Sequence, residues 1–250
     1  MLVLNATSTH FDAAIIDLDG TMVDTMGDFV AASSVMLAGL GLPSVSRDVV
    51  ERGVGKGSEH LIRYILNESN RTRAGVLQAC SATDREANKD MTALHPDDAL
   101  ALYLTSYRGI NGQHSHVYPG VVAGLQSLQR LGIKLACLTN KPLAFAQELL
   151  KLKGLDGFFS HVYGGDSFAR KKPDPLPLLS TCAALRTLPA RTLMIGDSSN
   201  DAQAARAAGC PVLLVTYGYN HGAPVRAVDA DGFVDSLTDL PALLQPVKSP

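Results

Sequence analysis

Short apolar runs with strand character recur along this 250-residue chain, and a helical pattern follows each of them. Strands that are apolar along their whole length are typical of a parallel sheet with helices on both faces. The alternation of such strands with helices therefore predicts an α/β fold with a doubly wound, Rossmann-like parallel sheet. The runs are AAIID at 13–17, IKLACLTN at 133–140, HVYGG at 161–165, TLMIGD at 192–197 and VLLVTYG at 212–218.

The spacing of these runs has one large irregularity. About 115 residues separate the first run from the second, whereas the later runs follow one another at intervals of about 20 to 30 residues. A structureless loop of that length is rare inside a compact domain, so the gap is expected to hold a folded insertion. Its sequence has helical periodicity and little strand signal. We therefore predict a core of residues 1–25 and 111–250 with an inserted helical cap domain of residues 26–110.

Composition narrows the class of partner. The chain has 22 basic and 24 acidic residues, a formal net charge of −2 and no long run of either sign. Because nucleic acids and anionic membranes are bound by basic patches, we expect a small-molecule partner, no nucleic acid and no membrane.

The four cysteines form no CxxC pair, which argues against a zinc site and a disulfide framework. The N-terminus lacks a basic segment followed by a long apolar stretch, which predicts a cytoplasmic protein. The oligomeric state is left open.

Polar side chains gather where three of the predicted strands end. In an open parallel sheet, ligands bind beyond the carboxyl ends of the strands, near the point where the winding reverses. A single Asp at such a position often only caps a helix or begins a turn, but three polar strand ends together indicate a functional site. These ends are Asp17-Leu18-Asp19-Gly20-Thr21, Thr139-Asn140-Lys141 and Gly196-Asp197-Ser198-Ser199-Asn200-Asp201.

The acidic residues at these strand ends require nearby positive charge to compensate them. Four carboxylates that crowd together repel one another and are costly to desolvate unless a cation or basic groups compensate them. Oxygen ligands without His or Cys favour Mg²⁺ over zinc. Lys172, in the RKKPDP segment after the third strand, is expected to offset charge on a phosphoryl group or a carboxylate nucleophile. A lone lysine is usually a solvated surface residue, but beside an Asp cluster that needs compensating charge a functional role is favoured.

Taken in order, four segments resemble the motifs of the haloacid dehalogenase superfamily of phosphatases. The resemblance spans the whole core, and the ordered set is more specific than any single motif. It implies a magnesium-dependent phosphatase that works through an aspartyl-phosphate, and a subgroup of the family carries a helical cap at the position of the insertion. The segments are DLDGT at 17–21, LTN at 138–140, KKPDP at 171–175 and GDSSND at 196–201.

Three further segments are similar to the members of that subgroup that hydrolyse 2-phosphoglycolate to glycolate and phosphate. They are VYPGV at 117–121, TNKP at 139–142 and VTYGYNHG at 215–222. The resemblance therefore implies a small phosphomonoester as the substrate.

The same resemblance implies catalytic roles. Asp17 is the expected nucleophile, and Asp19 is the expected general acid that protonates the leaving alcohol and then activates water. Such a pair makes physical sense, because close like charges push two pKa values apart and one proton can serve both steps. Thr139, Asn140 and Lys172 are expected to bind and orient the phosphoryl group.

The implied metal site draws on three of the acidic residues. The Asp17 carboxylate, the backbone carbonyl of Asp19 and the Asp197 carboxylate are expected to hold Mg²⁺. Asp201 has a supporting role, ordering water or Lys172. Gly20 allows a sharp turn after the strand, and its backbone N–H is a candidate phosphate contact.

The predicted cap contributes one more candidate feature. The GVGKGS segment at 53–58 does not fit the phosphate loop of nucleotide-binding proteins, because glycine follows Lys56 and no strand precedes it. Arg52 and Lys56 are instead candidate contacts for a carboxylate on the substrate.

Several alternatives share parts of this pattern. Substrate choice lies in the cap, so a phosphatase for another small phosphate ester or for pyrophosphate stays open. A phosphosugar mutase shares Asp17 and Asp19 but returns the phosphoryl group to a second hydroxyl. A phospho-receiver domain is opposed by the second Asp, the GDSSND segment and the large insertion. A dehalogenase has no evident use for Asp19 and Asp197.

Overall fold

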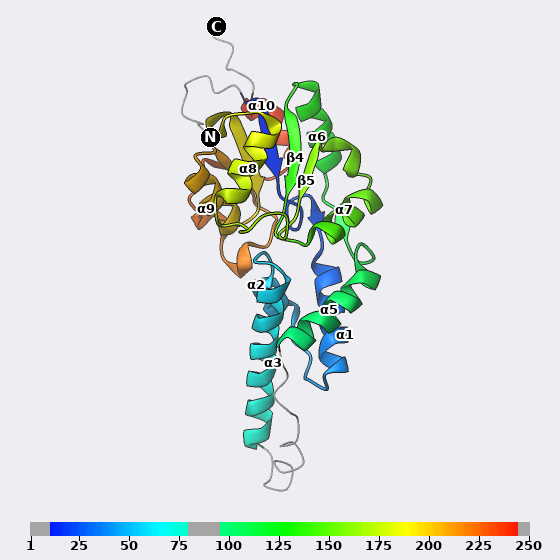
Figure 1. Ribbon diagram of the computed structural model, residues 1–250. Coiled ribbons are helices and arrows are strands. Elements are labelled where there is room, and N and C mark those ends of the chain that lie inside the picture. The colour runs from blue at the N-terminus through cyan, green and yellow to red at the C-terminus, as the bar shows by residue number, and fades with distance from the viewer. Residues whose placement is uncertain (1–10, 80–95, 245–250) are drawn as a thin grey trace.

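The computed structural model describes residues 11–79 and 96–244 and has a parallel sheet at its centre (Figure 1). Six strands lie in the order β5-β4-β1-β6-β7-β8, and every neighbouring pair is parallel. The doubly wound α/β fold predicted from the sequence is confirmed. The strands are β1 (Ala13–Ile16), β4 (Lys134–Leu138), β5 (His161–Tyr163), β6 (Thr192–Gly196), β7 (Val212–Val215) and β8 (Gly232–Val234).

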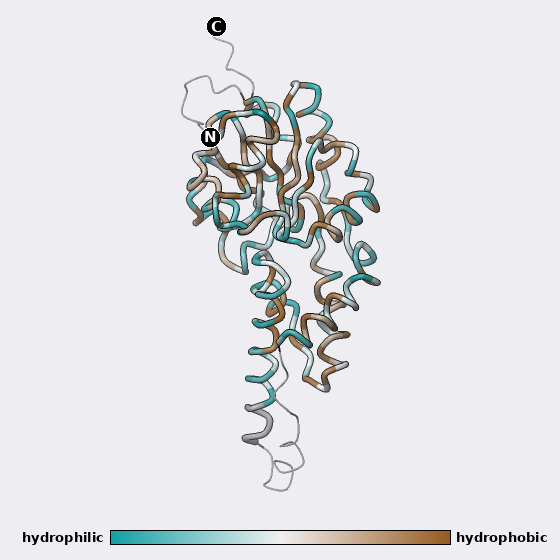
Figure 2. Tube along the Cα trace, in the orientation of Figure 1, coloured by the Kyte–Doolittle hydropathy of each residue, from teal (hydrophilic) through white to brown (hydrophobic). Residues whose placement is uncertain are grey.

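Helices cover both faces of this sheet, which explains why its strands are apolar along their length. Successive side chains of a strand point to opposite faces. In β1, Ala14 and Ile16 pack into the cluster that contains α6 and α7, whereas Ala13 and Ile15 pack into the cluster that contains α8 and α9. Figure 2 shows the hydrophobic residues concentrated along the central strands. The helices are α6 (Val121–Arg130), α7 (Leu143–Leu152), α8 (Leu176–Leu185), α9 (Ser199–Ala208) and α10 (Leu240–Leu244).

The winding of the chain reverses around β1. Strands β4 and β5 lie on one side of β1, whereas β6, β7 and β8 lie on the other. The carboxyl ends of β4, β1 and β6 are therefore neighbours at the switch point, where ligands bind in sheets of this kind.

A helical unit is inserted between two short strands, β2 (Val23–Asp24) and β3 (His116–Val117), which pair antiparallel. Its helices lie beyond the carboxyl end of the sheet, and α3 reaches farthest from it (Figure 1). They share an apolar cluster of their own, to which Phe145 and Tyr219 from outside the insertion also belong. The predicted helical segment includes residues 80–95, which lie outside the described residues. The helices are α1 (Met26–Gly39), α2 (Arg47–Gly53), α3 (Ser58–Ala79) and α5 (Pro96–Ile110).

Short 3₁₀ helices complete the elements of the described chain. No bilayer-spanning candidate occurs among the helices of residues 11–79 and 96–244, because none combines sufficient length with sufficient apolar character. The 3₁₀ helices are η1 (Asp156–Phe158), η2 (Pro189–Arg191), η3 (Asn220–Gly222), η4 (Val225–Ala227) and η5 (Leu237–Asp239).

Candidate active site

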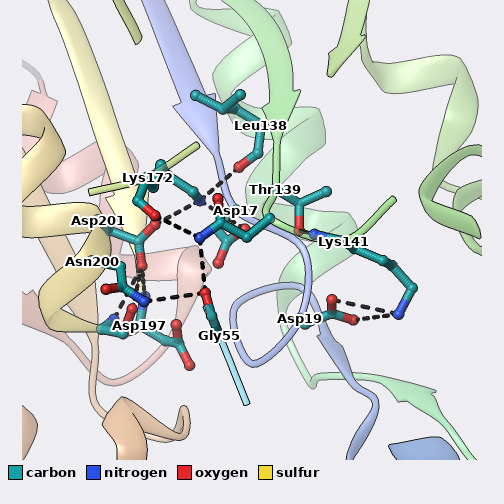
Figure 3. A network of polar contacts seen from close by, with 12 residues as sticks. Asp17, Asp19, Gly55, Leu138, Thr139, Lys141, Lys172, Asp197, Asn200 and Asp201 are labelled. Atoms are coloured by element: carbon teal, nitrogen blue, oxygen red, sulfur yellow. Dashed lines mark hydrogen bonds and ion pairs between the residues drawn. The ribbon is translucent and has the colours of Figure 1, made fainter. Parts of the chain in front are cut away.

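The three polar strand ends meet at one edge of the sheet (Figure 3). Asp17 directly follows β1, and its backbone N–H still donates to the Ile195 carbonyl of β6 at 2.9 Å. Thr139 directly follows β4, and Asp197 directly follows β6. The last bonds of the parallel sheet thus fix the backbones from which the polar side chains project.

Lys172 lies among these carboxylates, with a side chain that is only 2% exposed. Its Nζ is 2.9 Å from Asp17 Oδ1 and 2.7 Å from Asp201 Oδ1, and it donates to the Leu138 carbonyl at 2.8 Å. Burial lowers the pKa of Lys172, but the charges of Asp17 and Asp201 outweigh burial and raise the pKa above its ordinary value. The lysine therefore stays protonated at neutral pH.

Asp17 needs more positive charge than Lys172 provides. Burial raises the pKa of Asp17 to about 7, even though Lys172 lowers it. Its Oδ1 is buried and accepts no hydrogen bond of good geometry from the described residues, although the Lys172 ammonium lies nearby. A carboxylate in this environment is suited to a further cation or to an electrophile.

Asp17, Asp197 and Asp201 form a cluster that could hold a metal ion. Each offers a carboxylate oxygen, and these oxygens all lie within 4.8 Å of one another. Burial, followed by the charges of Asp201 and Asp17, raises the pKa of Asp197 well above its ordinary value. An oxygen-only set of this kind suits a hard divalent cation. The Asp19 carboxylate is not part of the cluster, so the side chains that the structure brings together are those of Asp17, Asp197 and Asp201.

Asp201 already has several partners from its own segment. Its Oδ2 accepts from Ser198 Oγ at 2.9 Å and from the backbone N–H groups of Ser198 and Asp197 at 3.2 and 3.3 Å. It closes the capping box at the start of α9. Together with its bond to Lys172, this geometry makes Asp201 a support for the site.

Two glycines make room for the Asp197 carboxylate. Gly20 has a φ of +81°, and a Cβ on it would lie 2.1 Å from Asp197 Oδ2. A Cβ on Gly218 would lie 2.2 Å from the Cβ of Asp197. The backbone N–H of Gly20 donates to the Val23 carbonyl at 2.9 Å. The phosphate contact expected from the amide of Gly20 is therefore not available, because this amide closes the turn.

Asp19 points away from the carboxylate cluster and toward Lys141 (Figure 3). Lys141 Nζ lies 3.1 Å from Asp19 Oδ1, and the lysine side chain is 3% exposed. No role was assigned to Lys141 from the sequence, although it belongs to one of the three polar strand ends. The signal that could have identified it is its place two residues after Thr139, at the end of a buried strand.

Asn140 ties several segments together. Its Nδ2 donates to the Gly55 carbonyl at 2.9 Å and to the Lys172 carbonyl at 2.8 Å. Both donors of the amide are thus used, which fits the expected orienting role better than a direct contact to phosphate. Thr139 Oγ1 accepts from the backbone N–H of Lys141 at 3.2 Å, and the same hydroxyl keeps its O–H donor.

The loop between α2 and α3 is fastened to the core by contacts that sequence analysis missed. Asn200 Nδ2 also donates to the Gly55 carbonyl, at 3.1 Å. His221 Nδ1 lies 2.7 Å from the Val54 carbonyl, and its Nε2 lies 3.2 Å from Asn200 Nδ2. Burial, and then Lys56, lowers the pKa of His221, so a neutral imidazole with a proton on Nδ1 fits both contacts.

A small cavity of ≈ 40 Å³ lies between the strand ends and the inserted helices. Asp17, Asp19, Thr139 and Lys141 line it together with aromatic residues of the insertion. Arg52 and Lys56 are exposed, and neither lines the cavity. Lys56 instead lines a second pocket together with Lys172 and Asn200, whereas Arg52 lines neither pocket.

Comparison with known proteins identifies the family. A family model of haloacid dehalogenase-like hydrolases matches residues 11–209. The chain belongs to the haloacid dehalogenase-like hydrolase family, as its motifs and the geometry of Asp17, Lys172 and Asp197 led us to expect.

Among the similar proteins are phosphoglycolate phosphatases. The protein of that name from Thiobacillus denitrificans is 40% identical over 91% of this chain and 92% of its own length. The plasmid-encoded phosphoglycolate phosphatase of Cupriavidus necator is 42% identical over 94% of both chains. The crystal structure of a predicted phosphoglycolate phosphatase from Haemophilus somnus 129PT superposes with a TM-score of 0.82 at 28% identity, covering 96% of this chain and 100% of that one.

Proposed function

We propose that this chain hydrolyses 2-phosphoglycolate to glycolate and phosphate with Mg²⁺ as its cofactor. The observation that carries the proposal is the buried Asp17 carboxylate, which faces a small cavity beside the protonated Lys172. The names and the high coverage of the similar proteins support phosphoglycolate as the substrate. The nearly neutral net charge also fits a small-molecule partner.

In the proposed reaction, a carboxylate oxygen of Asp17 attacks phosphorus while the bond from phosphorus to the ester oxygen breaks. Asp19 gives its proton to the departing alkoxide, which leaves as glycolate. Asp19 then takes a proton from water, whose oxygen attacks the aspartyl-phosphate and releases phosphate. Lys172 offsets charge on Asp17 and on the phosphoryl oxygens, and Thr139 donates its hydroxyl proton to one of those oxygens.

The residues present fit a magnesium ion. Asp17 and Asp197 would hold it with their carboxylates and Asp19 with its backbone carbonyl, and Asp201 supports the site through Lys172 and Ser198. When bound, Mg²⁺ supplies positive charge against the phosphoryl oxygens. Asp17 Oδ1, which is buried and has Lys172 as its ion-pair partner but accepts no hydrogen bond of good geometry from the described residues, and the space that Gly20 leaves around Asp197 both support this assignment.

Residues 26–110 act, in this proposal, as a cap over the site. The Gly55 carbonyl, which Asn140 and Asn200 both contact, fastens the cap loop at the mouth of the cavity. Exclusion of bulk water strengthens the electrostatic interactions around Asp17 and protects the aspartyl-phosphate from premature solvent attack.

We expect the purified protein to release inorganic phosphate from 2-phosphoglycolate faster than from phosphosugars or nucleoside monophosphates, because the cavity is small. Pyrophosphate, which is of similar size to 2-phosphoglycolate, is tested as a rival substrate. Excess EDTA should abolish this release, and added Mg²⁺ should restore it. Comparable rates of phosphate release from several esters would contradict 2-phosphoglycolate as the specific substrate. An isomerised phosphosugar without phosphate release would identify a mutase instead.

Replacing Gly20 by alanine should weaken Mg²⁺ binding about tenfold, because the new Cβ displaces the Asp197 carboxylate. Titration of Mg²⁺ by calorimetry and by activity would measure the change. Gly132→Ala is the matched control, because Gly132 has a similar φ of +77° and a Cβ added there would meet no atom within 4 Å. An equal Mg²⁺ affinity in the two variants would contradict the expected crowding.

A further inference from the structure

A single cation lines the cavity in the part of the chain that the structure describes. Among the lining residues, Asp17 and Asp19 carry negative charge and only Lys141 carries positive charge. Its neighbours in the cavity wall are aromatic. Nζ lies 4.8 Å from the centre of the Phe29 ring and 4.6 Å from that of the Tyr107 ring. Such surroundings screen a charge poorly, so the ammonium interacts strongly with any anion that enters.

The Lys141 ammonium retains capacity for a ligand. It contacts Asp19 Oδ1 at 3.1 Å and the Tyr107 hydroxyl oxygen at 2.5 Å. Burial, and then the charge of Asp19, raises the pKa of Tyr107 well above its ordinary value, so this partner is a neutral phenol. An ammonium has three N–H donors, and these two described partners leave one for a ligand in the cavity.

Lys172 cannot fill the same role. Its Nζ has three partners already, the carboxylates of Asp17 and Asp201 and the Leu138 carbonyl. It is also absent from the lining of the cavity among the described residues. The two buried lysines therefore differ in function, one compensating the carboxylate cluster and the other facing the space that a substrate would enter.

We propose that Lys141 binds the carboxylate of the substrate and thereby selects phosphate esters that carry one close to the ester oxygen. The inference rests on the proposed hydrolysis of 2-phosphoglycolate. In that molecule a single methylene group separates the ester oxygen from the carboxylate. If Asp19 protonates the ester oxygen, the carboxylate lies beside Asp19, where the Lys141 ammonium is found.

The location of Lys141 also explains how a small ligand can be recognised without a cation from the surface of the cap. Arg52 and Lys56 are exposed and lie outside the lining of the cavity. Lys141 instead lies three residues after β4, on the same strand end as Thr139. The group that binds the phosphoryl oxygens and the group that binds the carboxylate are thus held by one short stretch of backbone, which favours accurate placement of both.

The test compares 2-phosphoglycolate with ethyl phosphate, which has a methyl group in place of the carboxylate. We expect Lys141→Met to lower the ratio of kcat/KM for 2-phosphoglycolate to that for ethyl phosphate by about 10²-fold, because only the first substrate loses an ionic partner. Lys151→Met is the matched control, because Lys151 is exposed in the last turn of α7 and lines no part of the cavity, and its ratio should stay within about twofold of the wild-type value.

Two outcomes separate the inference from the proposed function. If the wild-type protein prefers 2-phosphoglycolate over ethyl phosphate and Lys141→Met keeps that preference, the inference is overturned while the proposed function stands. The same conclusion follows if the variant loses activity on both substrates equally. If the wild-type protein does not hydrolyse 2-phosphoglycolate, the proposed function fails. Circular dichroism checks that Lys141→Met folds. If it does not fold, Lys141→Gln, which keeps a hydrogen-bond donor for Asp19, is used in its place.

Discussion

Asparagine in place of Asp17 is expected to lower the turnover of 2-phosphoglycolate by at least about 10⁴-fold without loss of the fold. The amide has the same shape as the carboxylate but is a very poor nucleophile, and it cannot supply the charge that a metal ion needs. Folding should tolerate the change, because burial already raises the pKa of Asp17 to about 7 and a neutral amide is cheaper to bury than a carboxylate.

Phosphate release under saturating Mg²⁺ measures this effect, with thermal unfolding as the check on folding. Asp48→Asn is the matched control, since Asp48 is exposed in the first turn of α2, away from the strand ends. Activity of the Asp17 variant near that of the control would show that the phosphoryl group is not transferred to Asp17. A small residual rate would point to direct attack by water within an otherwise intact site.

Sequence patterns predicted five of the six strands of the parallel sheet, including β5, whose three residues are all only partly buried. Strands β1, β6 and β7 are buried at every position, so their residues form unbroken apolar runs. Strand β8 (Gly232–Val234) was missed because it begins with glycine, which disfavours strands, and lies between Asp231 and Asp235, so it forms no apolar run. Strands β2 and β3 were missed for a different reason. Each has two residues, and their pairing depends on segments that the insertion separates.

The residues that follow the strands could be predicted as a site because the topology of a parallel sheet brings strand ends together. For Asp17, Thr139 and Asp197, their position directly after a predicted strand was enough to predict that they lie close together. The contacts of the cap loop could not be predicted in this way. Gly55 lies 85 residues from Asn140 and 145 from Asn200 along the chain, and no local pattern fixes which carbonyl meets which amide.

The charge of a lysine in the sequence also does not indicate whether its side chain faces the substrate cavity. In the sequence, Lys56 and Lys141 are both single basic residues near glycine or polar neighbours. The structure exposes the first and buries the second against two aromatic rings and Asp19. Burial depends on the packing of α1 and α5 over the strand end, which is a tertiary property.

Removal of the Lys172 charge should affect stability as well as activity. We expect Lys172→Met to lower the free energy of unfolding by about 3–5 kcal/mol, because Asp17 and Asp201 are left buried without their cation. The folded-state pKa of Lys172 lies above its ordinary value, so this stabilisation is fully present at neutral pH and is lost only in strongly alkaline solution. Urea denaturation in EDTA at neutral pH measures the loss without a contribution from bound metal.

Two further variants, one at the neighbouring Lys171 and one at the partner carboxylate of Asp201, test whether the loss of stability comes from the ion pairs of Lys172. Lys171→Met should change the free energy of unfolding by less than about 0.5 kcal/mol, because Lys171 is only partly buried and the structure gives it no ion pair among the described residues. Asp201→Asn, added to Lys172→Met, should recover part of the lost stability by removing one of the uncompensated charges. If the double variant is destabilised by the full sum of the two single changes, Lys172 and Asp201 are not energetically coupled, and the buried lysine stabilises the protein by packing alone.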